Sequence, residues 1–215
     1  MDAGSGTCSA LQEFIDPLEL DAVVLSHVHP DHCIDLLAYF HLACYGPRIR
    51  EEIPVLAADL IEQRMCAFID AGPDHAFRRT FAFRTVSGGD IVLVGDIELA
   101  FANTEHPVPT VATRATWRGR SLVYTADTGP SPAVTALAAG VDVLLAEAAY
   151  QGTEKPWPHH MTAFEAGDMG AQAGAQRLIL THIGPAFDPN RSLIDAESTF
   201  GAPVRLAIPG STISI

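Results

Sequence analysis

The segment His27-Val-His-Pro-Asp-His32 limits what this chain can fold into more than any other feature, because it carries four potential metal ligands in six residues. It follows the apolar run Ala22–Leu25, which is typical of a buried strand that ends in a loop. Imidazole nitrogens and carboxylates are ligands that suit zinc or a similar divalent ion. A lone histidine near a strand end is more often a solvated residue, but four ligand-type residues together predict a metal site.

The spacing within this segment predicts ligands for two ions. His27 and His29 are two residues apart, so they point the same way from an extended chain. Pro30 then turns the chain, and Asp31 and His32 follow the turn. One short motif can therefore supply two adjacent metal positions.

Further ligand-type residues follow apolar runs downstream. Asp127 comes directly after the strand-like run Leu122–Ala126, and His182 comes directly after Leu178–Thr181. His106 stands before a Pro-Val-Pro stretch. Each residue alone also fits a turn-capping aspartate or a surface histidine, but together they indicate that strand ends deliver ligands to an open rim.

With these residues the chain resembles the metallo-β-lactamase-fold superfamily of hydrolases, whose H-x-H-x-D-H signature is followed by a histidine, an aspartate and a histidine. Within that superfamily it is most similar to ribonuclease Z and its cyclic-nucleotide phosphodiesterase relatives. Four strings carry this likeness: His106–Thr110, Tyr124–Gly129, His160–Ala166 and Arg177–His182.

The resemblance implies roles for particular residues. It implies a cofactor of two divalent metal ions, with zinc expected first and manganese or iron as alternatives. His27, His29 and His106 would bind one ion, Asp31, His32 and His182 the other, and Asp127 would bridge them. Asp31 would also orient the attacking hydroxide, which makes it a catalytic residue as well as a ligand. Asp2 is similar to an early structural aspartate of the superfamily.

His160 is expected to be catalytic rather than a metal ligand. It precedes Thr162 and Glu165, a capping-box pair that predicts a helix over Thr162–Gly174. The start of a helix favours anionic groups such as phosphate. An imidazole there can stabilise a transition-state oxyanion or protonate a leaving alkoxide. The alternative is a histidine that only supports the loop.

Apolar runs alternate with helical patterns along the chain, which predicts an α/β fold. Candidate strands are Ala22–Leu25, Val55–Ala58, Ile91–Val94, Ile97–Ala102, Ala112–Trp117, Leu122–Thr125, Val141–Leu145, Leu178–Thr181 and Val204–Ala207. Candidate helices are Cys8–Phe14, Ile34–Cys44, Asp59–Phe68, Pro132–Ala139 and Thr162–Gly174. The resemblance implies one four-layer αββα sandwich over residues 1–215 as a single domain. Superfamily members have strands before the early aspartate, so we expect the first strands of one sheet to be missing here.

The net charge of the chain indicates which class of substrate it can bind. The formal net charge is −13, and the one lysine is Lys155. A tRNA-binding protein is expected to show a basic patch, and only 20 residues separate His106 from Asp127, where ribonuclease Z carries its tRNA-binding arm. We therefore expect a small phosphodiester of the cyclic-nucleotide type as the substrate, cleaved by a metal-activated hydroxide, and do not expect tRNA as a partner. Arg114 and Arg118 are weaker candidates for phosphate contacts.

Three other expectations concern membrane association, cellular compartment and oligomeric state. No stretch reaches the ~20 apolar residues of a membrane span, so no membrane partner is expected. The four cysteines lack C-x-x-C pairing, which favours reduced thiols in the cytoplasm, although Cys33 stands beside His32. Relatives of this kind lead us to expect a homodimer.

Two alternative functions remain open at the level of sequence. The same ligands support hydrolysis of a lactone or β-lactam carbonyl, since fold and metals do not determine substrate. The chain could also be a non-catalytic metal-binding or interaction protein. The stretch from Tyr150 to Trp157 is either an aromatic lid that stacks on a base or a plain surface loop.

Overall fold

The computed structural model describes residues 1–215, which divide into two compact units, Met1–Ser87 and Gly88–Ile215. Each unit contains its own sheet and its own helices. The expectation of a single domain over residues 1–215 stays a prediction.

Unit 1 contains a parallel sheet of three strands in the order β1-β2-β3: β1 (Val23–Leu25), β2 (Ile53–Ala57) and β3 (Phe81–Thr85). Parallel neighbours need crossover connections, and helices supply them here. The helical elements are α1 (Thr7–Leu11), η1 (Pro17–Glu19), α2 (Pro30–Cys33), α3 (Leu36–Tyr45), α4 (Ile61–Phe68) and α5 (Ala76–Thr80). Leu25, Ile53 and Phe77 are fully buried in its core.

Unit 2 contains a mixed sheet of seven strands in the order β10-β9-β8-β7-β6-β5-β4. The strands are β4 (Ile91–Val94), β5 (Ile97–Asn103), β6 (Val111–Trp117), β7 (Arg120–Tyr124), β8 (Val143–Glu147), β9 (Leu178–Thr181) and β10 (Arg205–Leu206). β4 to β7 form an antiparallel meander, and β7 to β10 run parallel. The β6–β7 turn places Arg118 and Gly119 at φ of 49° and 78°, as a two-residue type I′ hairpin requires.

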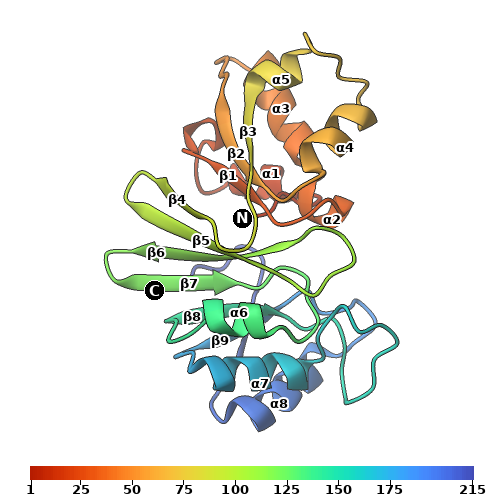
Figure 1. The fold of residues 1–215 in the computed structure, drawn as a ribbon, viewed down its shortest axis with the longest axis vertical. Helices are drawn as coiled ribbons and strands as arrows, with labels where there is room; N and C mark the ends of the chain where they lie inside the picture. The colour runs from red at the N-terminus through yellow and green to blue at the C-terminus, as the bar shows by residue number, and fades with distance from the viewer. The chain divides into compact units, whose positions relative to one another are not determined.

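Three helices connect the parallel strands of unit 2: α6 (Pro132–Leu137), α7 (Ala163–Ala173) and α8 (Pro189–Phe200). α7 and α8 lie side by side (Figure 1), and Gly167 allows their close approach, since a Cβ there would stand 2.3 Å from the carbonyl oxygen of Ala196. The helices and the sheet share one core, which includes Val134, Leu144 and Met161.

The strand directions in unit 2 decide where the loops gather. β5 runs parallel to β7, because both are antiparallel to β6. The carboxyl ends of β5, β7, β8 and β9 therefore lie at one edge of the sheet, where open α/β sheets place their sites. His106, Asp127 and His182 follow these ends at β5, β7 and β9.

The predicted α/β class is confirmed, and every predicted strand and helix has a counterpart. The bounds of β4 and β9 match the prediction at both ends, and the predicted capping box at Thr162 and Glu165 is present at the start of α7. The elements that were not predicted from the sequence are η1, α2, β3, α5 and α8. None of the helices combines the length and the apolar character needed to cross a membrane.

Candidate functional site

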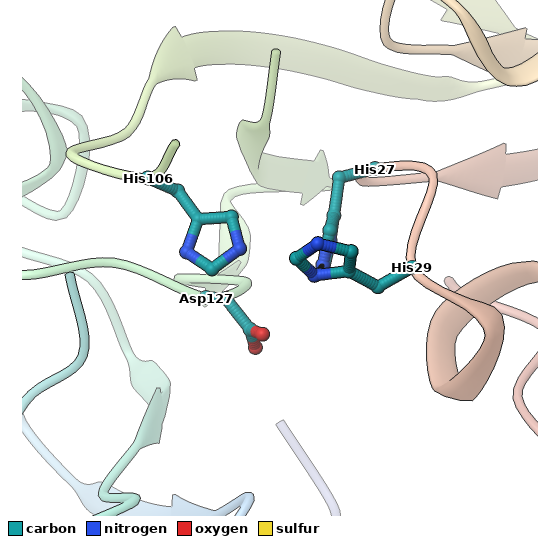
Figure 2. Close-up of side chains that lie close together, drawn as sticks. All are labelled: His27, His29, His106 and Asp127. Carbon is teal, nitrogen blue, oxygen red and sulfur yellow. Dashed lines mark hydrogen bonds between the residues drawn. The ribbon is translucent and has the colours of Figure 1, made fainter. Parts of the chain in front are cut away.

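The first group of predicted ligands lies in unit 1, on the loop that follows β1 and on α2. His27 is fully buried, and its Nε2 lies 2.9 Å from Nδ1 of His29. Figure 2 shows both side chains on this loop. His32 is buried on α2, and its Nε2 lies 3.5 Å from a carboxylate oxygen of Asp31, whose side chain is 64% exposed. The structure thus brings the four ligand-type residues of the motif together.

Asp2 holds this group in place. Its carboxylate accepts hydrogen bonds from the backbone N–H of Ser26 at 2.7 Å, from the Ser26 hydroxyl at 2.8 Å and from Nδ1 of His32 at 2.7 Å. Burial favours the neutral carboxyl, but the hydrogen bonds and positive charge of His32, with the Ser26 bonds, keep the pKa of Asp2 below its usual value. With Nδ1 bonded to Asp2, His32 presents Nε2 as its ligand atom.

The backbone of Ala3 and Gly4 also lies close to the motif. A Cβ at Gly4 would stand 1.9 Å from the carbonyl oxygen of Asp31, so only glycine fits there. The backbone N–H of Ala3 donates to the carbonyl oxygen of His32 at 2.7 Å. Residues 2–4 therefore brace the motif from one side.

Cys33 packs and does not act as a ligand thiolate. It is fully buried, and its thiol lies 3.3 Å from the carbonyl oxygen of His29. Burial, with the negative charges of Asp2 and Asp31, raises the pKa of Cys33 to about 11. The thiol thus lies against the backbone of the motif, at 3.3 Å from His29 and 3.5 Å from the carbonyl oxygen of Val28.

The second group of predicted ligands lies in unit 2, at the edge where the strands end. His106 donates from Nδ1 to the carbonyl oxygen of His159 at 3.2 Å, which leaves Nε2 as its ligand atom. The ligand atoms of His106 and Asp127 lie within 4.8 Å of one another, and Figure 2 shows these two side chains on separate loops of this unit. Nε2 of His182 lies 3.5 Å from the buried carboxylate of Asp127.

Backbone strain accompanies three of these positions. Ala126, which precedes Asp127, has a φ of 53°, and His182 has a φ of 54°. Asp2 has a φ of 55°. Non-glycine residues adopt this left-handed conformation at a cost of about 1–3 kcal/mol, and such strain concentrates at functional sites.

His160 lies in the same group of unit 2. Its ligand-type nitrogen, a carboxylate oxygen of Asp127 and a ring nitrogen of His182 lie within 4.8 Å of one another. The rings of His160 and His182 stack at 5.5 Å. The predicted position of His160 just before the N-terminus of α7 is confirmed.

Glu147 orients His160, and the sequence reading overlooked it. It is fully buried at the end of β8, and one of its oxygens accepts from Nδ1 of His160 at 2.9 Å and from the backbone N–H of Thr128 at 2.8 Å. The other oxygen accepts from the backbone N–H groups of Ala149 at 3.1 Å and Met161 at 3.2 Å. The signal was available, because a carboxylate that ends a buried apolar strand repeats the pattern of Asp127.

Two arginines have structural partners. Arg114 donates to the carbonyl oxygens of Leu137 and Ala139, both at 2.9 Å, at the end of α6. Arg118 stacks on the ring of Trp117 at 4.6 Å, in the β6–β7 turn. Both contacts account for these residues without a phosphate group.

The donor atoms of both groups fit divalent metal ions. In unit 2 the ligand atoms of Asp127, His160 and His182 lie within 4.8 Å of one another. In unit 1 the printed contacts are pairs, His27 with His29 at 2.9 Å and His32 with Asp31 at 3.5 Å. Imidazole nitrogens and carboxylate oxygens are the donor set of catalytic zinc sites. Unit 1 supplies the predicted ligands His27, His29, Asp31 and His32, and unit 2 supplies His106, Asp127 and His182, with His160 beside them. How these residues share ions between them stays a prediction.

Comparisons with known proteins agree with these observations. A family model described as the beta-lactamase superfamily domain matches residues 2–183. The chain is 32% identical to an uncharacterized protein of Mycobacterium leprae, over all of this chain and 77% of that protein. It is 29% identical to the probable metallo-hydrolase YhfI of Bacillus subtilis, over 98% of this chain and 85% of that protein.

Similarity extends to a ribonuclease Z and to solved structures. The ribonuclease Z of Methanopyrus kandleri is 26% identical over 93% of this chain and 81% of its own length. The crystal structure of YhfI superposes with a TM-score of 0.85 at 26% identity, over 98% of this chain and 83% of that one. A diphosphatase of the PhnP family superposes with a TM-score of 0.76 at 19% identity, over 100% of this chain and 78% of that one, which shows a shared fold.

Proposed function

Because the chain belongs to the beta-lactamase superfamily and is a metallo-hydrolase, we propose that it cleaves small phosphodiesters of the cyclic-nucleotide type. The observation that carries this proposal is the oriented pair of Glu147 and His160 beside Asp127 and His182. Hydrolysis of a phosphodiester expels an alkoxide, and an imidazolium oriented by a carboxylate suits its protonation.

The proposed cofactor is a pair of divalent ions, with zinc first and manganese or iron as alternatives. A catalytic zinc takes three protein ligands and keeps a position open, so seven ligands with one shared suffice for two ions. The superfamily match runs from residue 2 to residue 183 and includes every proposed ligand. We assign His27, His29 and His106 to one ion, Asp31, His32 and His182 to the other, and Asp127 to both. When bound, two such ions would neutralise charge on the phosphate and lower the pKa of the attacking water.

The protein's own residues complete the proposed reaction. Asp31 is the exposed carboxylate of its group and would orient the attacking water. Glu147 accepts the Nδ1–H of His160, and its negative charge would stabilise the doubly protonated imidazolium, whose Nε2 proton would pass to the leaving oxygen. Asp2 holds Nδ1 of His32 in the same way.

The partner proposed for this site is a small molecule. A formal net charge of −13 with a single lysine opposes the phosphate contacts that hold tRNA. The ribonuclease Z similarity therefore supports phosphodiester chemistry and not a tRNA substrate. The cytoplasmic location and the homodimer remain expectations of the same kind.

The test is hydrolysis by metal-quantified protein of bis(p-nitrophenyl) phosphate, 2′,3′-cyclic AMP, 3′,5′-cyclic AMP, a lactone and nitrocefin. We expect two ions per chain by elemental analysis and turnover of the phosphodiesters. Asp127→Ala is expected to lose metal and activity, and His160→Ala to keep its metal but lose about 10²- to 10⁴-fold in kcat. His41→Ala, an exposed histidine on α3, is the matched control and should behave as wild type.

Other outcomes decide between the alternatives. Turnover of the lactone or nitrocefin alone, insensitive to His160→Ala, would move the assignment to carbonyl hydrolysis. Two bound ions without turnover of any substrate would indicate a non-catalytic protein.

A further inference from the structure

The segment of residues 151–158, which we call the Trp157 arm, connects β8 to the start of α7 without regular secondary structure. Its one aromatic side chain is Trp157, which keeps 40% of its surface exposed. Exposed single apolar residues are ordinary on protein surfaces, so the surroundings of this ring decide whether it has a role.

Trp157 lies against two histidines of the site. Its ring centroid is 5.3 Å from that of His160 and 6.0 Å from that of His106. It also lies 5.4 Å from the ring of His159. The indole thus borders the residues that the proposed function assigns to the phosphate and to a metal ion.

The arm is fastened at its beginning to α8. The side-chain amide of Gln151 donates to the carbonyl oxygen of Asp188 and, at 2.9 Å, to the hydroxyl of Ser192. The backbone N–H of Gly152 donates to the buried carboxylate of Asp195 at 3.0 Å. These bonds hold the first two residues of the arm.

The chain's only lysine fastens the middle of the arm to the catalytic histidine. Lys155 donates to both carboxylate oxygens of Glu165, at 2.6 and 2.8 Å, and to the backbone carbonyl of His160 at 2.9 Å. Glu165 is also the capping-box residue of α7. The positive charge of Lys155 is therefore paired with the carboxylate of Glu165.

The end of the arm packs against the Asp127 loop. A Cβ at Gly129 would stand 2.3 Å from the carbonyl oxygen of Pro158, so the two backbones are in direct contact. Pro156 and Pro158 flank Trp157, and their fixed φ angles restrict the backbone on both sides of it. Because the backbone around Trp157 is already held in place, ligand binding to the exposed indole costs less conformational entropy.

We propose that Trp157 is the platform on which the substrate's nucleobase stacks, so that it selects phosphodiesters that carry a flat aromatic base. The proposal rests on the proposed function, in which His160 acts on the phosphate group. A base linked to that phosphate through one sugar would lie over the neighbouring indole. Indole is a large aromatic surface that stacks on any base, because every base has a π-face.

The kinetic test compares two substrates, 3′,5′-cyclic AMP and methyl riboside 3′,5′-cyclic phosphate, which lacks the base. Base–aromatic stacking predicts that Trp157→Ala lowers kcat/KM for cyclic AMP by roughly tenfold or more, mainly through KM. The base-free substrate should change by less than about twofold, and Trp157→Phe should keep much of the preference. The matched control is Trp117→Ala, since Trp117 is 46% exposed at the far end of β6. An equal loss with both substrates overturns the platform.

A binding test needs no turnover. The chain has two tryptophans, so Trp117→Phe leaves Trp157 as the only one. We expect saturable quenching of its fluorescence by AMP and none by ribose 5-phosphate, while the Trp157→Phe protein shows no response. Quenching by ribose 5-phosphate or by choline that equals that of AMP would overturn the preference for a base.

The two tests separate failure of the platform from failure of the proposed function. Turnover of cyclic AMP without AMP quenching removes the platform and leaves the phosphodiesterase. Quenching by AMP without turnover of any diester keeps the platform and removes the catalytic proposal.

Discussion

Three histidines of the candidate site bond through Nδ1 to a carboxylate or to a backbone carbonyl oxygen. Nδ1 of His32 bonds to Asp2, Nδ1 of His106 to a backbone carbonyl oxygen and Nδ1 of His160 to Glu147. A histidine held through Nδ1 presents Nε2, and its ring orientation no longer depends on the ligand. Single residues outside the ligand set therefore determine which atom each histidine offers.

The substitution Glu147→Gln tests whether Glu147 orients His160. The amide has one oxygen to accept hydrogen bonds, where the carboxylate has two, and it carries no negative charge to stabilise a protonated His160. We expect kcat for cyclic AMP to fall by about 10- to 100-fold and the pH profile of kcat to move, because the proton on His160 is no longer held. The measurement is kcat between pH 5 and 9.

The control is Glu98→Gln, an exposed position on β5 that should match wild type. A Glu147→Gln enzyme with reduced kcat but an unmoved pH profile would contradict the positioning role and leave Glu147 as a structural residue.

Ala126 gives a stability prediction from backbone strain. Its φ of 53° is unfavourable for alanine by about 1–2 kcal/mol, which glycine avoids. Relief of this strain in Ala126→Gly should offset two costs, the loss of a buried methyl group and the greater conformational entropy of the unfolded chain. The free energy of unfolding should therefore change by less than about 0.5 kcal/mol. Ala112→Gly, fully buried on β6, has no strain to relieve and should cost about 1–2 kcal/mol. Urea unfolding measures both, and equal costs would show that Ala126 is unstrained.

At the scale of elements, the two ends of the parallel strands in unit 2 carry different kinds of residue. At one edge their carboxyl ends carry the site residues, and near the other edge Asp142 ties the start of β8 to β7. Its carboxylate accepts from the backbone N–H and hydroxyl of Ser121, at 2.8 and 3.0 Å, and from Arg120 at 3.2 Å. The sheet register on which the site depends is thus reinforced by a charged group.

These bonds predict how stability depends on pH. The backbone and hydroxyl bonds from Ser121, and then the nearby Arg120, lower the pKa of Asp142 in the folded protein. A lowered folded pKa contributes stability that is fully present above the unfolded value of about 3.9 and is lost as the pH falls through the folded value. Asp142→Asn should therefore lower the melting temperature at pH 7, and the difference should shrink below about pH 4.

Thermal unfolding from pH 7 to pH 3 measures this difference. Asp96→Asn, in the exposed β4–β5 turn, is the matched control and should leave the melting temperature unchanged. A difference between Asp142→Asn and wild type that stays constant across this range would contradict the pKa argument.

At the scale of the whole molecule, the proposed metal ligands are distributed over both units. His27, His29, Asp31 and His32 belong to unit 1, and the remaining three ligands belong to unit 2. Ions that bind only the folded protein stabilise it by mass action.

Calorimetry of metal-loaded protein is therefore expected to show one unfolding transition, as the single-domain expectation over residues 1–215 requires. Removing the metal with a chelator should lower the transition temperature. His41→Ala should match wild type in both states. Two separate transitions in the loaded protein would contradict the single-domain expectation.

Local patterns in the sequence determined the α/β class, the ligand types and the start of α7. A strand followed by H-x-H-x-D-H, or a capping box, depends on residues within a few positions of one another. β4 and β9 were predicted at both ends for the same reason. α8 also had local signals in Asp188 and Pro189, which the sequence reading did not use.

Only the tertiary structure decided which residues support the ligands. Glu147 is 13 residues from His160, and Asp2 is 30 residues from His32, so no local pattern connects these pairs. The same holds for Trp157 and His106. β3 was overlooked because it alternates polar and apolar residues only weakly and follows α5 without a turn. Ligand type depends on residue chemistry and near neighbours, whereas ring orientation, burial and stacking depend on strands that the chain brings together only when it folds.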